Sequence, residues 1–300
     1  MHIDPSGCAG KIVDIHGAVG VAWLERLPSI IAGCARRWSL TVLSPFADLS
    51  YNYVAPAIRQ DGAHVVLKAG VPHLELFREI AALSWFDGQG IVRLLDADPE
   101  AGILLLEQLE PGTPLSDLDN DEEATRIAAR LIRAVCKPAQ AEHHYATLAG
   151  WAAGLAGLRA RFDGGCGPFP ANLVNKAERL FEELIASTTE QMLIHGDLHH
   201  GNILRSEREP WLALDPKGVV GEPSWDVVYF SRSLLSEAGE PKRVLVRRMN
   251  QMAAELGFDP TRMVAWGLAQ SILTGWWSFE DHGRGYKPDI ACAEMFEELQ

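Results

Sequence analysis

Five short, mostly apolar stretches in the first third of the chain are bounded by polar and turn-forming residues and predict β-strands, and apolar and polar residues alternate in the first of them, residues 38–43. The expected strands cover residues 38–43, 51–55, 64–68, 91–95 and 103–109. Residues 73–86 instead carry Leu76, Ile80 and Leu83 at helical spacing, and residues 1–35 are also helix-like. We therefore expect a small five-stranded antiparallel sheet with one helix between its third and fourth strands, preceded by a helical extension.

The pattern changes after residue 110, where Pro and Gly in residues 110–114 predict an inter-lobe linker. Apolar positions then recur at helical spacing. The expected helices cover residues 121–136, 172–185, 241–257 and 259–279, and the last begins with Asp259 as N-cap and Pro260 at the first helical position. The chain is thus predicted to have a two-lobed α+β fold, with a lobe at residues 1–110 and a mainly helical lobe at residues 111–300.

Bulk composition narrows the class of protein. The chain has 300 residues, no run of eighteen apolar residues and no signal-peptide pattern at its start, so we expect no membrane-spanning helix. Five scattered cysteines without a CxxC motif predict free thiols and a cytoplasmic protein. A formal net charge of -13 argues against a nucleic acid as partner and is compatible with a cationic small molecule.

The densest chemistry lies in residues 193–218, where short hydrophobic stretches flank a polar loop. Asp197, Asn202 and Asp215 suit phosphoryl transfer, which needs a carboxylate to deprotonate a hydroxyl and oxygen ligands for Mg²⁺. Asp215 follows Asp197 by 18 residues, which is room for a β-hairpin that returns Asp215 to the side of Asn202.

The same stretch allows a second interpretation, a transition-metal site built from histidines. Its ligands would be His195, Asp197, His199 and His200. However, adjacent histidines on a regular strand face opposite ways, and the spacing does not match a zinc-binding helix. A metal hydrolase is therefore the less favoured interpretation.

Lys68 ends the third expected strand, where a lysine standing alone would most often face solvent. Glu79 lies eleven residues further on, in the middle of the following helix, and could hold the ammonium against ATP phosphates. Glu75, one turn earlier, is a competing partner. In the fifth strand the backbone around Glu107 and Leu109 could bind the adenine edge, although a plain core strand fits equally well.

Together these motifs resemble the aminoglycoside phosphotransferase family, which has a protein-kinase-like fold. Within it the chain is most similar to the streptomycin 6-phosphotransferase group, also described as aminoglycoside/hydroxyurea resistance kinases. The matching pieces are residues 65–68, Glu79, residues 92–95, 106–107, 195–202, 211–218 and 220–223, and Asp226. The helical tail at residues 259–277 is similar too.

The resemblance implies a role for each polar residue of these motifs. Asp197 would be the catalytic base, and Asn202 and Asp215 would hold Mg²⁺. Lys68 with Glu79 would position the phosphates of ATP.

Two further residues would support the catalytic loop: His195 would brace it, and Asp226 would be the buried acid beneath it. The chain departs from protein kinases at three places. Residues 44–50 contain no glycine, residues 215–217 read Asp-Pro-Lys, and Gly196 stands where protein kinases have arginine. These departures argue for a small-molecule acceptor.

Acceptor contacts are expected from the helical lobe, because aromatic faces and carboxylates suit an ammonium- or guanidinium-bearing sugar. The candidates on the last long helix are Trp266, Gln270, Trp277, Glu280 and Asp281, and Glu222 is a further one. Core packing for the tryptophans and solvent exposure for the acids is the alternative.

The sequence thus predicts an ATP- and Mg²⁺-dependent phosphotransferase that modifies a hydroxyl of a cationic small molecule, an aminoglycoside or aminocyclitol, and so confers antibiotic resistance. A metabolic kinase for choline, a sugar or an amino alcohol is the first alternative. A non-catalytic nucleotide-binding protein is the second, although Lys68, Asp197, Asn202 and Asp215 are all present. We expect a monomer or homodimer without nucleic-acid or membrane partners.

Overall fold

The structure is a computed structural model that describes residues 6–47, 49, 51–140 and 142–300. Contacts divide the chain into two compact units, Met1–Gly112 and Thr113–Gln300.

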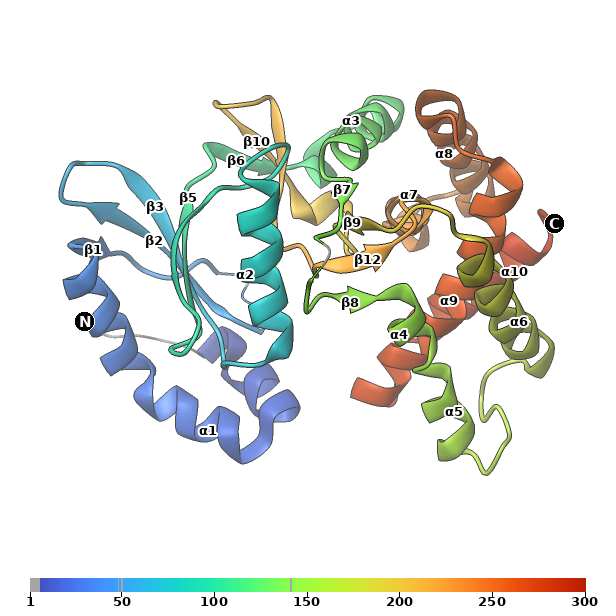
Figure 1. The fold of residues 1–300 in the computed structure, drawn as a ribbon, viewed down its shortest axis with the longest axis horizontal. Coiled ribbons are helices and arrows are strands. Elements are labelled where there is room, and N and C mark those ends of the chain that lie inside the picture. The colour runs from blue at the N-terminus through green and yellow to red at the C-terminus, as the bar shows by residue number, and fades with distance from the viewer. Residues whose placement is uncertain (1–5, 48, 50, 141) are drawn as a thin grey trace. The chain divides into compact units, whose positions relative to one another are not determined.

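The N-terminal unit contains a five-stranded antiparallel sheet with the order β1-β2-β3-β5-β4 (Figure 1). Its strands are β1 (Leu40–Val42), β2 (Tyr53–Arg59), β3 (His64–Ala69), β4 (Leu94–Asp98) and β5 (Ile103–Glu107). Helix α2 (Leu74–Phe86) connects β3 to β4, and α1 (Ser6–Arg37) precedes the sheet. Buried residues of α1, among them Leu27 and Ile31, form one hydrophobic core with Val65 and Leu67 of the sheet.

One strand prediction and the linker prediction need correction. The fourth strand was expected at residues 91–95 but begins at Leu94, because Ile91 and Val92 are buried in a loop that follows the left-handed Asp87 and Gly88. The expected linker forms a short strand, β6 (Pro111–Pro114), across the boundary of the two units.

Helix α1 bears on the membrane prediction. It is interrupted at Gly17, whose φ of 53° and ψ of -132° are not helical, and it contains Pro28. By length and composition alone, its segment Cys8–Arg37 could cross a bilayer, with a mean hydropathy of 1.3. A helix that contributes to the core of a globular unit passes the same test, so the absence of a membrane-spanning helix stays a prediction.

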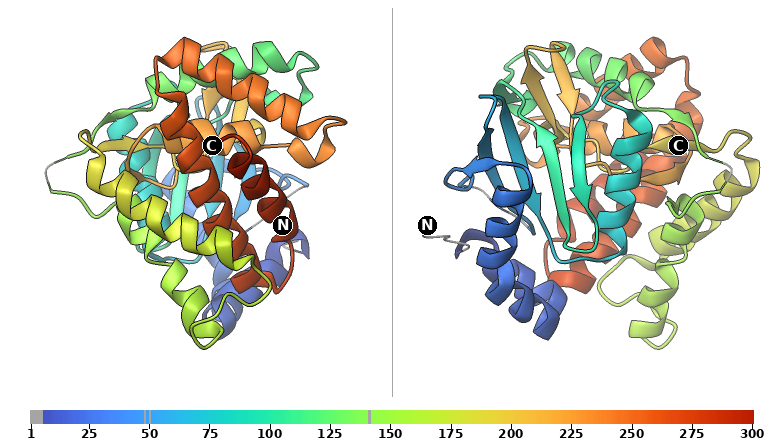
Figure 2. Two further views of the ribbon diagram at one scale, coloured as in Figure 1. Left: turned by 90° about the vertical axis from the view of Figure 1, so that its right-hand side faces the viewer. Right: turned by 60° about the vertical axis from the view of Figure 1, so that its left-hand side comes forward.

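The C-terminal unit is mainly helical. Its α-helices are α3 (Asp121–Ala134), α4 (Leu148–Ala152), α5 (Leu155–Arg161), α6 (Ala171–Ser187), α7 (Ser224–Arg232), α8 (Pro241–Leu256), α9 (Pro260–His282) and α10 (Lys287–Glu297). Short 3₁₀ turns occur at Leu115–Asp117, His200–Asn202 and Leu235–Glu237. Helix α9 packs against α6, α7 and α10, and Figure 2 (left) shows α9 running between α6 and α10. Most of its faces are therefore covered.

Small sheets interrupt these helices. Strand β12 (Val219–Gly221) pairs antiparallel with β9 (Met192–Ile194) and parallel with β8 (Ala146–Thr147), and β7 (Lys137–Pro138) pairs with β9. Strands β10 (Ile203–Ser206) and β11 (Trp211–Ala213) form an antiparallel hairpin.

Helix α9 begins as its sequence predicts. The Asp259 carboxylate accepts a hydrogen bond of 2.9 Å from the Thr261 amide, and Pro260 occupies the first turn.

Candidate active site

The polar loop of residues 195–202 lies between β9 and the β10–β11 hairpin. At the base of that hairpin the Leu214 amide donates a 3.0 Å hydrogen bond to the Asn202 carbonyl. Asp215 therefore follows directly beside Asn202, and the hairpin expected from their spacing is confirmed.

Side chains of helix α7 hydrogen-bond to the backbone of this loop. The two carboxylate oxygens of Asp226 accept the His195 and Gly196 amides at 2.9 and 2.8 Å. The Trp225 indole donates to the Gly196 carbonyl at 3.2 Å. Burial raises the pKa of Asp226 to about 7, whereas the two amide donors act in the opposite direction. Side chains of α7 thus bind both N–H groups and a carbonyl group of the loop backbone.

His195 links the loop to the returning strand. Its Nε2 lies 2.8 Å from the Leu214 carbonyl, and its Nδ1 accepts the Asp197 amide at 3.2 Å. Because Nδ1 accepts, Nε2 carries the proton in this arrangement. Burial lowers the pKa of His195 to about 4, so the ring is neutral at neutral pH.

The other two histidines of the loop turn to separate partners. The His199 Nδ1 accepts the Gly201 amide at 3.1 Å. The His200 ring stacks on Phe230 with centroids 4.2 Å apart, and its Nδ1 lies 3.0 Å from the Ser233 hydroxyl. Within residues 6–300, apart from positions 48, 50 and 141, no three His, Cys, Asp or Glu side chains are grouped to hold a metal ion. The described residues therefore offer no ligand set for the metal hydrolase.

Asn202 and Asp215 supply the oxygen chemistry expected for Mg²⁺. The Asn202 Nδ2 donates to the Asp197 carbonyl at 3.0 Å, which fixes the amide and assigns its oxygen to the opposite side. Asp215 has a φ of 59°, a left-handed conformation that costs an L-residue roughly 1–2 kcal/mol. Such strain is characteristic of functional sites, and an amide oxygen with a carboxylate is a donor set that fits Mg²⁺.

Lys68 and Glu79 form the expected ion pair in the N-terminal unit. The Lys68 Nζ lies 2.7 Å from the Glu79 Oε1, and the two side chains are only 4% and 10% exposed. The competing Glu75 is 49% exposed and lies 3.8 Å from His73. Burial of both charges makes each dependent on the other, because a buried charge without a partner is strongly unfavourable.

Some hydrogen-bonding groups of the strand expected to bind adenine are already used within the protein. The Glu107 amide donates to the Arg93 carbonyl at 3.1 Å, and the Glu107 carboxylate accepts the Arg93 amide at 2.8 Å. The Glu107 N–H is therefore not available to a nucleotide. The contribution of Leu109, whose side chain is buried, stays a prediction that concerns its backbone.

Two acceptor candidates on α9 are core residues, contrary to prediction. Trp266 and Gln270 are fully buried. Trp266 packs on Phe181 and Trp225 with ring centroids 6.0 Å away in both cases. The Gln270 amide donates to the Trp225 carbonyl at 3.0 Å. Their helix face packs on neighbouring helices, so neither side chain offers surface to an acceptor.

Glu222 is also committed to the fold. The Arg262 guanidinium holds both of its oxygens, at 2.8 and 2.7 Å from Nε, and the Ser224 hydroxyl donates to it at 2.9 Å. Arg262 in turn donates to the Leu184 carbonyl at 2.8 Å. Arg262 thus ties the start of α9 to the end of α6, and its contacts with both carboxylate oxygens contradict an acceptor role for Glu222.

The end of α9 retains the other three candidates. The half-buried Trp277 meets Trp151 of α4 edge to face at 5.5 Å between centroids, and a Cβ on Gly196 would lie 3.0 Å from the Trp151 ring. An aromatic wall therefore extends from the catalytic loop to Trp277. Glu280 and Asp281 are exposed beyond it, and burial together with Asp281 raises the pKa of Glu280.

Sequence reasoning missed two aromatic residues beside the catalytic loop: Trp151 near Gly196, and Tyr229, whose ring centroid lies 6.4 Å from that of His199. Trp151 lies in a five-residue helix with no periodic pattern, and Tyr229 follows Asp226 by one turn of α7. The position of Tyr229 relative to Asp226 was the only available signal, since residues three apart share a helix face.

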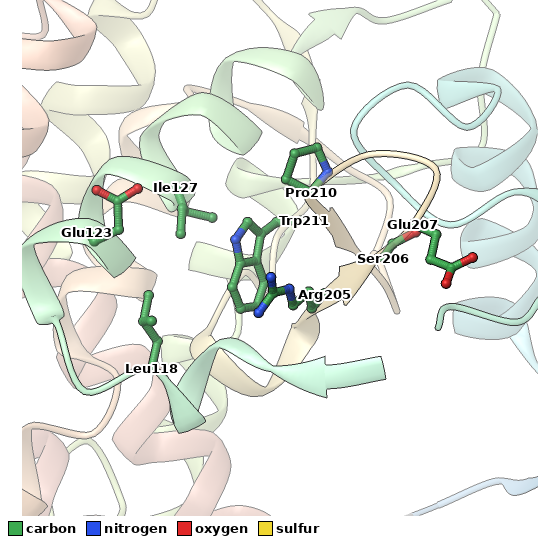
Figure 3. A pocket seen from close by; sticks show the side chains of 8 residues that line it. All are labelled: Leu118, Glu123, Ile127, Arg205, Ser206, Glu207, Pro210 and Trp211. Atoms are coloured by element: carbon green, nitrogen blue, oxygen red, sulfur yellow. The ribbon is translucent and has the colours of Figure 1, made fainter. Parts of the chain in front are cut away.

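A separate cavity of about 460 Å³ lies where the start of α3 meets the β10–β11 hairpin (Figure 3). Its lining includes Glu123, Arg205 and Trp211. It contains none of the candidate catalytic residues.

The comparisons with known proteins agree with this geometry. The family described as aminoglycoside/hydroxyurea antibiotic resistance kinase matches residues 37–283. Streptomycin 6-kinase of Streptomyces glaucescens is 31% identical over 296 residues, which are 95% of this chain and 93% of the relative. Hydroxyurea phosphotransferase of Kitasatospora aureofaciens is 34% identical over 290 residues, 93% of this chain and 81% of the relative.

A solved structure shares the fold. A thermostable mutant of aminoglycoside phosphotransferase APH(4)-Ia, in a ternary complex with ADP and hygromycin B, superposes with a TM-score of 0.61. The match has 13% identity and covers 89% of this chain and 96% of that chain. The expected protein-kinase-like fold, with its five-stranded antiparallel sheet and mainly helical C-terminal part, is confirmed.

Proposed function

Because the chain belongs to the aminoglycoside/hydroxyurea antibiotic resistance kinase family and is a phosphotransferase, we propose that it transfers the γ-phosphoryl group of ATP to a hydroxyl of streptomycin or a closely similar aminoglycoside. One observation carries this proposal. The loop that bears Asp197 is hydrogen-bonded to Asp226 before this residue and to Asn202 after it, and Asn202 and Asp215 lie beside each other.

Each charged residue then has a role in the transfer. Asp197 accepts the proton of the acceptor hydroxyl while the hydroxyl oxygen forms a bond to the γ-phosphorus. The bond between the γ-phosphorus and the bridging oxygen breaks, and ADP leaves with that oxygen. Asn202 and Asp215 would hold Mg²⁺, which when bound offsets the negative charge of the phosphates. Lys68, oriented by Glu79, contacts the phosphates of ATP.

The end of α9 supports a cationic acceptor. Trp151 and Trp277 present aromatic faces and edges that start at the catalytic loop, and Glu280 and Asp281 add two exposed carboxylates. Guanidinium and ammonium groups bind favourably to both. We extend the proposal to drug inactivation in the cytoplasm, where ATP is available, which would protect the host cell from the antibiotic.

Hydroxyurea is a second candidate acceptor, because a hydroxyurea phosphotransferase is among the relatives at 34% identity. An uncharged acceptor of that size would not need the acidic end of α9. The two acceptors therefore differ in their dependence on Glu280 and Asp281.

A screen of acceptors tests the proposal. Purified protein is incubated with ATP and Mg²⁺ plus streptomycin, hygromycin B, hydroxyurea or choline, and products are measured by mass spectrometry. We expect streptomycin to gain one phosphoryl group, and chelation of Mg²⁺ to abolish the product. Turnover of choline alone would identify a metabolic kinase, and binding of ATP without turnover of any acceptor would favour a non-catalytic protein.

A further inference from the structure

The cavity between α3 and the β10–β11 hairpin lies apart from the candidate catalytic residues (Figure 3). Its volume of about 460 Å³ is in the range of pockets that bind small molecules. The base of the hairpin carries Asn202 and Asp215, whereas Arg205 and Trp211, which line the cavity, form the third cross-strand pair from that base. The proposed phosphoryl transfer therefore leaves this cavity without a role.

Apolar side chains supply much of the lining. Ile127 of α3 is 5% exposed, and Leu118 and Trp211 are half-buried. The Trp211 ring lies in the middle of the lining residues, below Pro210 in the view of Figure 3. An indole that keeps part of its surface in a cavity offers a face on which another aromatic ring can stack.

A cation of the lining has no partner within the described part of the chain. Arg205 lies opposite Trp211 in the register of the hairpin, so the two side chains are neighbours on one face. Figure 3 shows the Arg205 guanidinium beside the indole. Among the described residues no hydrogen bond or ion pair involves this guanidinium, and its side chain is exposed. It is therefore available to an anion.

The two carboxylates of the lining do not neutralise Arg205. Glu123 is paired with Arg126 of its own helix. Glu207 points away from the Trp211 ring (Figure 3). The charge left beside the aromatic face is therefore positive, in a chain whose formal net charge is -13.

We propose that this cavity binds a small planar anion, an aromatic ring that carries a carboxylate or a similar anionic group. The ring stacks on Trp211, and the anionic group accepts hydrogen bonds from the Arg205 guanidinium, whose planar fork matches a carboxylate. The acidic chain as a whole repels anions, so a preference for an anion has to arise locally. The inference is independent of the proposed function, because no candidate catalytic residue takes part.

Three indole compounds with different side-chain charges test the site. Indole-3-acetate is an anion, indole-3-ethanol is neutral and tryptamine is a cation, and ligand-observed NMR gives their dissociation constants for the full-length protein. We expect indole-3-acetate to bind about two- to fivefold more tightly than indole-3-ethanol, the range for an exposed ion pair, and tryptamine to bind most weakly. Equal affinities, a tighter complex with tryptamine, or no binding of indole-3-acetate would overturn the inference.

Variants of Arg205 locate the preference. Arg205→Gln should remove the preference for indole-3-acetate and leave the affinity for indole-3-ethanol unchanged, and Arg205→Glu should make tryptamine the tightest ligand. Arg208→Gln is the matched control, because Arg208 lies in the turn of the same hairpin but pairs with Glu209 at 2.8 Å. It removes the same charge and should retain the preference. An equal loss of preference in both Gln variants would assign it to net charge and contradict the inference.

Trp211→Leu tests the aromatic contact. It should weaken the binding of all three compounds by about three- to tenfold, the range for a lost aromatic stack, and unchanged affinities would refute the site. Thermal unfolding of each variant checks that the fold is retained. If Trp211→Leu does not fold, the variants of the exposed Arg205 side chain still decide the inference, because a preference for indole-3-acetate that persists in Arg205→Glu overturns it.

Discussion

The loop around Asp197 and the end of helix α9 both carry candidate functional residues, but the fold holds them very differently. Around Asp197, the amides of His195 and Gly196 and the side chain of Asn202 each have a hydrogen-bond partner within 3.0 Å. At the end of α9, Glu280 and Asp281 are exposed. Under the proposed function, the difference predicts that the chemical step depends on a preorganised geometry and that acceptor recognition depends on exposed charges.

The largest effect on stability is expected in the N-terminal unit, where the Lys68–Glu79 ion pair is buried. Lys68→Met leaves a buried carboxylate without its ammonium and should lower the free energy of unfolding by about 3–5 kcal/mol. Lys242→Met breaks an exposed pair with Glu298 and should cost roughly 1 kcal/mol or less. Urea denaturation of both variants measures the contrast, and equal losses would show that the burial of the pair carries no weight.

A smaller effect is expected when the tight packing of the loop is disturbed. In Gly196→Ala the new Cβ would lie 2.8 Å from Val219 and 3.0 Å from Trp151, at a φ of 86°. Gly164 has nearly the same φ, 85°, and no atom within 4 Å of such a Cβ. Gly164→Ala therefore measures the backbone cost alone, and Gly196→Ala should be less stable by about a further 1–3 kcal/mol. Thermal unfolding of the two variants gives the difference, which would vanish if the loop packed loosely.

The loop should also respond to acid. Burial lowers the pKa of His200 from 6.5 to about 3, so the unfolded chain binds a proton there while the folded protein does not. This contribution to stability is complete above pH 6.5 and is lost as pH falls toward 3. The raised pKa of Asp226 affects stability in the opposite direction, because its contribution is lost as pH rises from about 4 to about 7. A variant at His200 retains Asp226, so this contribution cancels when the variant is compared with the parent protein.

We therefore expect His200→Gln to reduce the fall in unfolding free energy between pH 6 and pH 5 by about 1 kcal/mol, which approaches the 1.4 kcal/mol of one proton per pH unit. Denaturation at both pH values measures the slope. An identical slope in the variant and the parent protein would mean that His200 is not buried in its neutral form.

The smallest effects are expected at the end of α9. Glu280→Gln and Asp281→Asn should each raise KM for a cationic acceptor about two- to fivefold, the range for an exposed ion pair, and leave KM for ATP unchanged. Trp266→Phe, a change in the buried half of the same helix, should leave the acceptor KM unchanged. Steady-state kinetics measures these KM values. A larger rise of the acceptor KM in Trp266→Phe than in Glu280→Gln and Asp281→Asn would contradict the proposal that the exposed end of α9 binds the acceptor.

The sequence could predict those features that depend on local pattern. Asp259 and Pro260 indicate where α9 begins, and the 18 residues between Asp197 and Asp215 predict the hairpin that returns Asp215 to Asn202. The pairing of Lys68 with Glu79 follows from the helix position of the glutamate. All three depend on spacing along one or two neighbouring elements.

Features that depend on which helices meet could not be read in this way. Trp266 and Gln270 share a helix face with Trp277, but α7 covers the first two, as the contacts of Trp225 show. Asp226 reaches the His195 and Gly196 amides only because α7 packs against the loop. A helical period shows that residues share a face and leaves open whether that face meets a neighbour or solvent.

The most direct test of the central claim compares Asp197→Asn with the parent protein in turnover of streptomycin and in binding of ATP with Mg²⁺. If Asp197 is the base, kcat should fall by about 10²–10⁴-fold, while calorimetry should give the same nucleotide affinity and unfolding the same temperature. Undiminished turnover in Asp197→Asn would contradict the account.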